Sequence, residues 1–517
     1  MHVSRDGGAH WDDVTPKGMP DWIMINEIEA SPLDKGAAYM AATNYKNDDQ
    51  QPYLYKTADY GKTWTKIVDG IAANHFTRVV RSDTKRRGLL FAGTENGIYV
   101  SFDDGGHWQS LQLKLPLTPV TDLRVREDAL IVATQGRGFW MLDDIEPLRQ
   151  FTPELLTKPA HLFTPAPVWR LDAGAGRRPN AAVGQNPMPG AVVDFLLHDQ
   201  KPGTKVSLAF LGSDGKVVRE YKGEVVKEAA KGTEIKAADV MNPAPPPAAA
   251  PAPKEAVKSE GGRAEKQGGE EEKDKPAAAG GKDDEDKLPD LVNGHNRVAW
   301  DLRYPDAKRP EGMILWAGST TGPRVLPGTY SVKLTVGDQS MTAPLTLRAD
   351  PRLSATPADM KAQFDFTYAI WQKVTEMHTQ IERIRDVRKQ LGEVKKRVGD
   401  AKESKPIVDA ANDLDKKMTA VEEALYQTKN KSSQEPLNFP IRLNDKLSGV
   451  ADSAALGDFA PTAQHIATRD ELLKQVDEQL AKLKAIWATD LPAFNKLAAS
   501  VPAVKVETDE KKGEPST

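Results

Sequence analysis

Side chains that could do chemistry recur in polar stretches between residues 44 and 137. The candidates are Asp48, Asp49, His75, Glu95, Asn96 and Arg137. Carboxylates beside a histidine and an arginine could serve acid/base chemistry on a glycosidic bond. Arg137 is flanked by glycines and could reach an acidic ligand, or equally pack against a strand. Because polar residues are common in any loop, we predict ligand binding for these six and identify no catalytic residue.

Motifs of several other chemistries are missing from the sequence. The chain contains no His-Glu-x-x-His, Gly-x-Ser-x-Gly or Gly-x-x-x-x-Gly-Lys-Ser/Thr string, and its nine histidines include no i, i+4 pair. It has no cysteine, which excludes disulfides, thiolate zinc sites and cysteine nucleophiles. We therefore predict neither a metal site nor a cofactor.

One short pattern, Ser/Thr-x-Asp-x-Gly-x-x-Trp, occurs three times. Its members are Ser4, Asp6, Gly8 and Trp11, then Thr57, Asp59, Gly61 and Trp64, then Ser101, Asp103, Gly105 and Trp108. The starts lie 53 and 44 residues apart, which is the spacing of four-stranded propeller blades. Aspartate accepts hydrogen bonds from turn amides, glycine adopts a positive φ, and tryptophan packs between neighbouring sheets. We predict that these residues staple hairpins and bind no ligand.

Strand-like runs precede the second and third copies of this pattern. They cover residues 25–30, 37–43 and 53–56 before the second copy, and 78–81, 89–93 and 97–100 before the third. A last unit, at 121–126 and 129–134, has no such turn and ends in Gly-Arg-Gly-Phe-Trp-Met-Leu-Asp-Asp at 136–144. The elements that must position the candidate residues are therefore predicted to be antiparallel strands.

These turns resemble Asp-box (BNR) repeats, which occur in sialidases, xyloglucanase-type glycoside hydrolases and sortilin-like propellers. With the ending at 136–144, they are similar to the closing blades of large bacterial sortilin-like proteins, often labelled glycosyl hydrolases from their repeats alone. The resemblance implies a partial β-propeller over residues 1–147. It also implies a binding mouth on the face opposite the Asp boxes, where the six candidate residues would lie.

The number of blades bears on the expected partners. Three units and the tail strand of a preceding one are present, whereas propellers typically have four to eight blades. We expect the chain to be the C-terminal portion of a longer protein, whose remaining N-terminal blades would be one partner. A protein, peptide or glycan in the propeller mouth would be the other.

Residues 160–350 are predicted to form a second domain. The run 329–336 alternates polar and apolar residues, as a half-buried strand does. The strings at 296–303 and 327–330 resemble the FlgD-like immunoglobulin-type module, which implies an Ig-like β-sandwich. Within it, residues 242–287 contain Val257 as the only aliphatic residue larger than alanine or proline, so we predict a disordered insertion there.

Residues 354–500 are predicted to be helical. Apolar residues recur at three- and four-residue steps over 371–398, over 407–425 and from Ile466 to Trp487. This pattern indicates an antiparallel bundle of three long helices, with a shorter helix near 443–455. The charged tail at 502–517 is predicted to be disordered. The predicted fold class is thus multidomain, mainly β and then α.

Composition excludes some partners. Lys plus Arg is 70 against 74 for Asp plus Glu, and this near balance argues against a protein that coats nucleic acid. No stretch reaches the roughly 18 apolar residues that a membrane span needs. The N-terminus lacks the order of a signal peptide, so an extracytoplasmic location is expected from the family resemblance alone.

Two functions remain as hypotheses. The favoured one is a non-catalytic extracytoplasmic binding or scaffold protein, because the sequence offers abundant scaffold and no identifiable acid/base pair. The alternative is a glycoside hydrolase of sialidase or xyloglucanase type whose catalytic residues lie mostly in blades absent from this chain. A sialidase needs three arginines around a carboxylate, but nothing in the spacing of Arg78, Arg81, Arg124 and Arg137 selects a triad.

Overall fold

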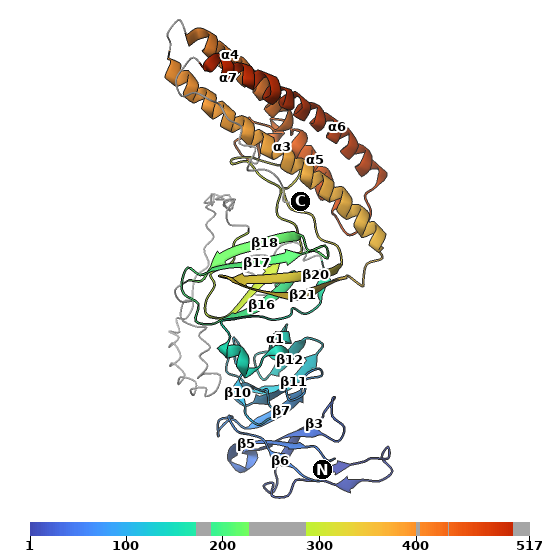
Figure 1. The fold of residues 1–517 in the computed structure, drawn as a ribbon. Helices are drawn as coiled ribbons and strands as arrows, with labels where there is room; N and C mark the ends of the chain where they lie inside the picture. The colour runs from blue at the N-terminus through green and yellow to red at the C-terminus, as the bar shows by residue number, and fades with distance from the viewer. Residues whose placement is uncertain (172–187, 227–285, 400–403, 433, 500–517) are drawn as a thin grey trace, which may run out of the picture.

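The computed structural model describes residues 1–171, 188–226, 286–399, 404–432 and 434–499. Its strands precede its long helices along the chain, which confirms the predicted β-then-α layout. Figure 1 shows a stack of small sheets at the N-terminal end, larger sheets in the middle and long helices at the opposite end. The predicted disordered tail at 502–517 lies outside the described residues.

The N-terminal stack consists of antiparallel sheets whose strands are neighbours in sequence order. They are the hairpin β1 (His2–Val3) and β2 (Asp12–Asp13); β3 (Met24–Ala30), β4 (Ala38–Asn44), β5 (Asp49–Thr57) and β6 (Thr65–Lys66); β7 (Thr77–Ser82), β8 (Leu90–Thr94), β9 (Gly97–Ser101) and β10 (Gln109–Ser110); and β11 (Val120–Arg126), β12 (Ala129–Thr134) and β13 (Phe139–Leu142). Separate apolar cores lie between successive sheets. Stacked four-stranded meanders of this kind give the region a propeller-like fold.

The three Asp boxes form nearly identical hairpin turns. In each, the serine or threonine hydroxyl accepts a hydrogen bond from the glycine N–H, at 2.7 Å in the first box, 3.0 Å in the second and 2.9 Å in the third. In each, the aspartate also accepts a backbone N–H four residues later, at 2.9 Å. Gly61 and Gly105 both have φ +83°, which side-chain-bearing residues rarely adopt.

The hydrogen bonds of the second box make a pH prediction. The backbone N–H and hydroxyl of Thr63 lower the pKa of Asp59 from 3.8 to about 2. Because the folded pKa is depressed, ionised Asp59 stabilises the fold above about pH 4, and this contribution is lost as the pH falls towards 2. We expect an NMR titration of the Asp59 carboxyl to have its midpoint near 2. Thr63→Ala should raise that midpoint, and a wild-type midpoint near 3.8 would contradict the prediction.

The repeat predicted that all three box tryptophans pack between sheets, but the structure differs from this prediction at one of them. Trp108 is fully buried and Trp64 is half-buried, but Trp11 is 62% exposed. The prediction is therefore wrong for Trp11. The reason is local: its hairpin β1–β2 lies at the end of the described stack, and no sheet covers its outer side.

The middle region has two sheets around one core. The first contains β14 (Ala160–Leu162), β16 (Ala191–Leu197) and β19 (Gly294–Trp300); the second contains β15 (Val168–Arg170), β21 (Gln339–Ala349), β20 (Gly328–Val336), β17 (Lys205–Leu211) and β18 (Val217–Glu224). Phe195 and Trp300 of the first sheet and Phe210 of the second are buried in that core. The rings of Phe210 and Trp300 stack with their centroids 4.5 Å apart. The short helix α1 (Glu146–Gln150) precedes this region.

The disorder predicted for residues 242–287 is wrong at its last two residues. Asp286 and Lys287 belong to the described structure, and the rest of the predicted segment lies outside it. The Asp286 carboxylate accepts a hydrogen bond from Arg219 at 2.8 Å, and its carbonyl accepts one from the Lys222 N–H at 2.9 Å. Backbone pairing alongside β18 therefore orders the end of a segment whose composition alone predicted disorder.

The helices are α3 (Pro357–Val398), α4 (Lys405–Leu425), α5 (Leu443–Ala454), α6 (Ala463–Ala485) and α7 (Leu491–Ala498), with a π-helical turn at Ile486–Asp490. The Thr356 hydroxyl accepts the Asp359 N–H, and the Asp359 carboxylate accepts the Thr356 N–H, which together start α3. Apolar faces of all five helices share one core.

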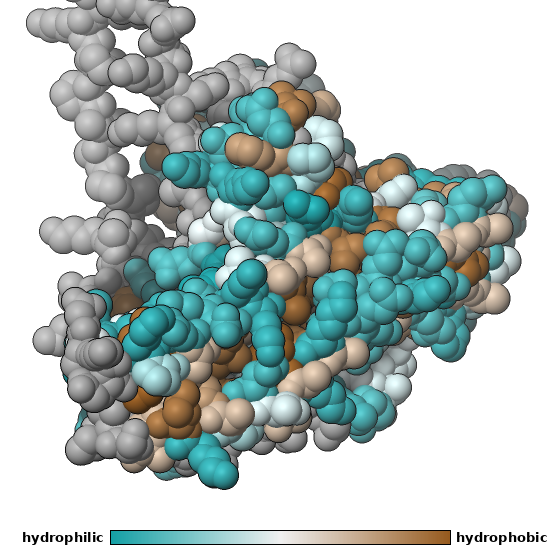
Figure 2. Space-filling model, turned by 90° about the horizontal axis from the view of Figure 1, so that it is seen from above, coloured by the Kyte–Doolittle hydropathy of each residue, from teal (hydrophilic) through white to brown (hydrophobic). Residues whose placement is uncertain are grey.

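Figure 2 shows hydrophilic side chains over most of the view from above, with hydrophobic residues between them. Ile466, predicted to face the core, is instead 41% exposed, and Leu472 is the buried residue of the first turns of α6.

Several polar contacts fasten the helices to the middle region, and two sets of them involve buried or partly buried carboxylates. Arg170 of β15 and Asp458, which precedes α6, form an ion pair in which both side chains are almost fully buried. The Asp445 carboxylate of α5 accepts the backbone N–H groups of Trp316, Ala317 and Gly318 at 2.8–3.0 Å. None of the helices in the described ranges combines the length and apolar character needed to cross a membrane.

Candidate functional site

All six candidate residues lie at one edge of the stacked sheets. Alternate connections of an antiparallel meander lie at the same end, so the β4–β5, β6–β7, β8–β9 and β12–β13 connections share an edge opposite the Asp boxes. Asp48 belongs to the β4–β5 loop and Asp49 begins β5, His75 belongs to the β6–β7 connection, Glu95 and Asn96 to β8–β9, and Arg137 to β12–β13. The structure brings two of them, Asp48 and Asp49, into one pocket.

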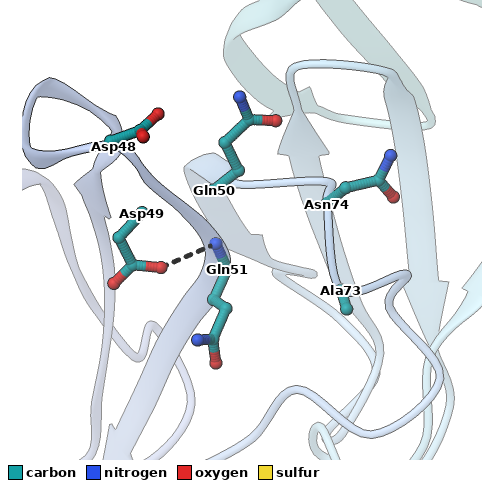
Figure 3. A pocket seen from close by; sticks show the side chains of 6 residues that line it. All are labelled: Asp48, Asp49, Gln50, Gln51, Ala73 and Asn74. Carbon is teal, nitrogen blue, oxygen red and sulfur yellow. Dashed lines mark hydrogen bonds between the residues drawn. The ribbon is translucent and has the colours of Figure 1, made fainter.

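This pocket lies between the β4–β5 loop and the β6–β7 connection and has a volume of about 610 Å³. Its lining residues are Asp48, Asp49, Gln50, Gln51, Ala73 and Asn74. Figure 3 shows the first four following one another along the loop and into β5, with Ala73 and Asn74 on the facing connection. The lining therefore consists of carboxylates, carboxamides and one methyl group.

Asp49 is fixed by neighbours on its own strand and loop. It accepts hydrogen bonds from the Tyr53 hydroxyl at 2.6 Å, the Asn44 amide at 3.0 Å and the Gln51 N–H at 3.1 Å. The bond from Tyr53 is the main cause of the lowered pKa of Asp49. An ionised carboxylate with three donors is poorly suited to be a general acid, so Asp49 organises the pocket wall.

Asp48 is the more accessible carboxylate. Its backbone is left-handed, with φ +60°, and its N–H donates to the Tyr45 carbonyl at 3.1 Å. Within the described parts of the chain, no hydrogen bond or ion pair engages its carboxylate. Asp48 can therefore accept hydrogen bonds from a ligand without giving up an internal contact.

His75 is buried beside the pocket. Its Nδ1 lies 2.8 Å from the Tyr99 hydroxyl, and burial lowers the pKa of His75 and raises that of Tyr99. The histidine is 8% exposed. Burial disfavours the charged form of His75. The buried ring supports the β6–β7 connection, and the side chain does not line the pocket.

The other candidates lie outside the pocket. Glu95 pairs with Arg78 at 2.6 Å, and Arg78 lies over the ring of Phe76 at 5.2 Å. The Asn96 N–H donates to the Thr94 hydroxyl, and the Arg137 carbonyl accepts the Trp140 indole N–H at 3.0 Å. Each contact stays within one turn or between adjacent strands.

The Arg81 guanidinium is engaged by partners inside the stack. Its side chain is 5% exposed and binds Glu27 and Glu29 of β3 and Asp122 of β11, the last at 2.8 Å. It also donates to the Leu123 carbonyl at 2.7 Å. These partners occupy the guanidinium and tie three neighbouring sheets together.

Sequence reasoning missed Gln50, Gln51 and Asn74 as lining residues. Their signal was position only, since each lies one or two residues from a candidate that was selected for its charge or histidine chemistry. Carboxamides both donate and accept hydrogen bonds, so this lining can bind hydroxyl or peptide groups. Among the described residues, no group of three His, Cys, Asp or Glu side chains could hold a metal ion.

Comparisons with known proteins return distant structural likenesses. No family model and no curated protein matches the sequence. An ancestral GH74 enzyme is similar at 18% identity and a TM-score of 0.19, over 22% of this chain and 14% of that one. YCF48 from Cyanidioschyzon merolae is similar at 14% identity and a TM-score of 0.20, over 28% of this chain and 46% of that one. The chain thus spans less than half the length of either protein.

Proposed function

We propose that the chain is a non-catalytic binding or scaffold protein that takes a protein, peptide or glycan ligand in the pocket beside the β4–β5 loop. The observation that carries this proposal is the lining: three carboxamides, one methyl group and two carboxylates, of which Asp49 is already engaged by internal hydrogen bonds. Asp49 is held ionised by its donors and His75 is buried. The pocket therefore offers several hydrogen-bonding groups, and none of its lining residues is a histidine.

Finer assignments belong to the same proposal. The three boxes fit BNR-type repeats of a sortilin-like propeller, the two sheets of the middle region an Ig-like sandwich, and the helices an antiparallel bundle. An extracytoplasmic location accompanies this reading. These assignments rest on the sequence resemblance and on the strand order described above.

Ligand arrays carrying peptides, sialosides and β-glucans test this function. For any ligand that binds, Gln50→Ala and Asn74→Ala should each weaken affinity about 2- to 13-fold, since one hydrogen bond contributes about 0.5–1.5 kcal/mol net. Gln479→Ala on α6 removes a carboxamide far from the pocket in sequence and fold and should leave affinity unchanged. Equal binding by the pocket variants and the control would contradict the proposal.

The same variants distinguish the hydrolase alternative. If the chain is only a binder, it should turn over neither sialosides nor β-glucans. Turnover that Asp48→Asn abolishes, with binding retained, would favour a glycoside hydrolase instead.

A further inference from the structure

The connection between β19 and β20 leaves the middle sheets and then returns to them. Its two legs are hydrogen-bonded to each other. The Tyr304 N–H donates to the Pro323 carbonyl at 3.0 Å, and the Ala307 N–H donates to the Thr320 carbonyl at 2.7 Å. Residues 308–319 between the legs, called here the docked loop, lie against the helices (Figure 1). The ends of this loop are therefore next to each other at the middle region.

The carbonyls of the docked loop accept hydrogen bonds from α3. His378 Nδ1 donates to the Lys308 carbonyl, and the Arg385 guanidinium donates to the Glu311 carbonyl at 3.0 Å. The Lys308 ammonium also forms an ion pair with Glu382 of α3 at 2.5 Å. Because His378 is fully buried, its hydrogen bond to the loop is made away from water and is costly to lose.

The N–H groups of the docked loop donate to the end of α4 and to α5. The Ile314 N–H donates to the hydroxyl of Tyr426, which directly follows α4, at 3.2 Å. Three successive N–H groups, at 316–318, donate to the Asp445 carboxylate of α5 at 2.8–3.0 Å. Hydrogen bonds to an ionised carboxylate are stronger than neutral ones. The helices thus bind the loop largely through its backbone, which is how many peptide-binding sites gain affinity.

Two positions of the docked loop are also specified by packing. Met313 is 2% exposed and belongs to the helical core, where the Asn444 amide lies 3.4 Å from its sulfur. A Cβ on Gly318 would lie 2.3 Å from the backbone nitrogen of Gly449 on α5, so only glycine fits there. The groove between α3 and α5 therefore selects an extended peptide that has an unbranched apolar residue and, five residues later, a glycine.

We propose that the helical region is a peptide-binding module whose groove is filled by the docked loop of its own chain. The external ligand is an extended segment of a partner protein with the residue pattern of the loop, and it competes with the loop for the same groove. The docked loop is thus an autoinhibitory contact. This inference is independent of the ligand proposed for the pocket, because the pocket lies in the N-terminal stack.

Removing the docked loop from the full chain tests the proposal. Residues 308–319 are replaced by a Gly-Gly turn, which can join the legs because Ala307 and Thr320 are hydrogen-bonded. A fluorescein-labelled synthetic peptide of residues 306–321 is then titrated and followed by fluorescence anisotropy. The peptide should bind the deletion variant at least about tenfold more tightly than the wild-type chain, because the tethered loop competes at an effective concentration of about 1 mM.

Two peptide variants keep the test specific. Gly318→Ala in the peptide should abolish binding to the deletion variant, whereas Thr321→Ala, outside the docked loop, should leave affinity unchanged. The proposal would be overturned if the peptide bound neither chain or both alike, or if the Gly318→Ala peptide bound as well as the parent.

Folding and self-association give two further outcomes. If the deletion variant loses helical circular dichroism, the parent peptide should restore it, and a failure to do so would contradict the proposal. Dimerisation of the wild-type chain that Gly318→Ala abolishes would also overturn it, since the groove would then take the loop of a second copy.

Discussion

Asp458→Ala is expected to lower the free energy of unfolding by about 3–5 kcal/mol, the range for breaking a buried ion pair by removing one partner. Arg170 and Asp458 are 2% and 4% exposed as side chains, and Arg324 lies 3.7 Å from the same carboxylate. Without Asp458, two guanidinium groups would lose their anion in a place with little water. Chemical denaturation followed by tryptophan fluorescence measures the loss.

A surface aspartate serves as the matched control for this change. Asp365 pairs with Lys361 at 2.6 Å, but both side chains are more than half exposed, so Asp365→Ala should cost no more than about 0.5 kcal/mol. Arg170 also donates a hydrogen bond to the Val325 carbonyl at 2.8 Å. Removing Arg170 instead of Asp458 should therefore additionally loosen the segment around Val325. A similar small effect of Asp458→Ala and Asp365→Ala would show that the ion pair does not hold the helices to the middle region.

Trp108→Ala is expected to have a comparably large effect, about 3–5 kcal/mol, as for a large aromatic residue removed from a packed core. Trp108 is fully buried between two sheets, and its indole N–H satisfies the Ile67 carbonyl. The substitution would leave both a cavity and an unpaired carbonyl. Urea midpoints of the full chain measure the change.

Trp11→Ala is the internal control for that experiment, because it changes the same residue of the same motif. The side chain is 62% exposed and bonds only within its own turn, so the expected loss is at most about 0.5 kcal/mol. Equal losses at Trp11 and Trp108 would mean that the boxes stabilise their own hairpins and contribute nothing between sheets.

Features carried by neighbouring residues could be predicted from the sequence. The Asp-box turns form within eight residues, and the cap of α3 forms within four, so their residue types alone specify their hydrogen bonds. The strand order of the N-terminal stack is likewise local, since each strand pairs with the next one along the chain. Ile466 shows the limit of periodicity, because a helical stripe does not state how far a partner helix covers it.

The candidate site was predicted less completely than the fold. Charge and histidine chemistry selected Asp48, Asp49 and His75, and the first two do line the pocket. His75 does not, because its contact with Tyr99 depends on how β9 packs beside the β6–β7 connection. The carboxamides on both walls have no sequence signature, and they became lining residues only when two loops from different sheets met.

The sequence by itself determined the repeated turns, the order of strands before helices and the helix starts, because short-range hydrogen bonds and periodicity suffice for these. Tertiary structure alone decided the rest: which tryptophan is buried, which carboxylate is free, and which arginine is neutralised. Arg81 meets carboxylates from two other strands, and Arg170 meets Asp458 from a distant helical connection. Such ion pairs form only when the fold brings together segments that are far apart in the sequence. The residue type of an arginine does not specify which carboxylate it will contact.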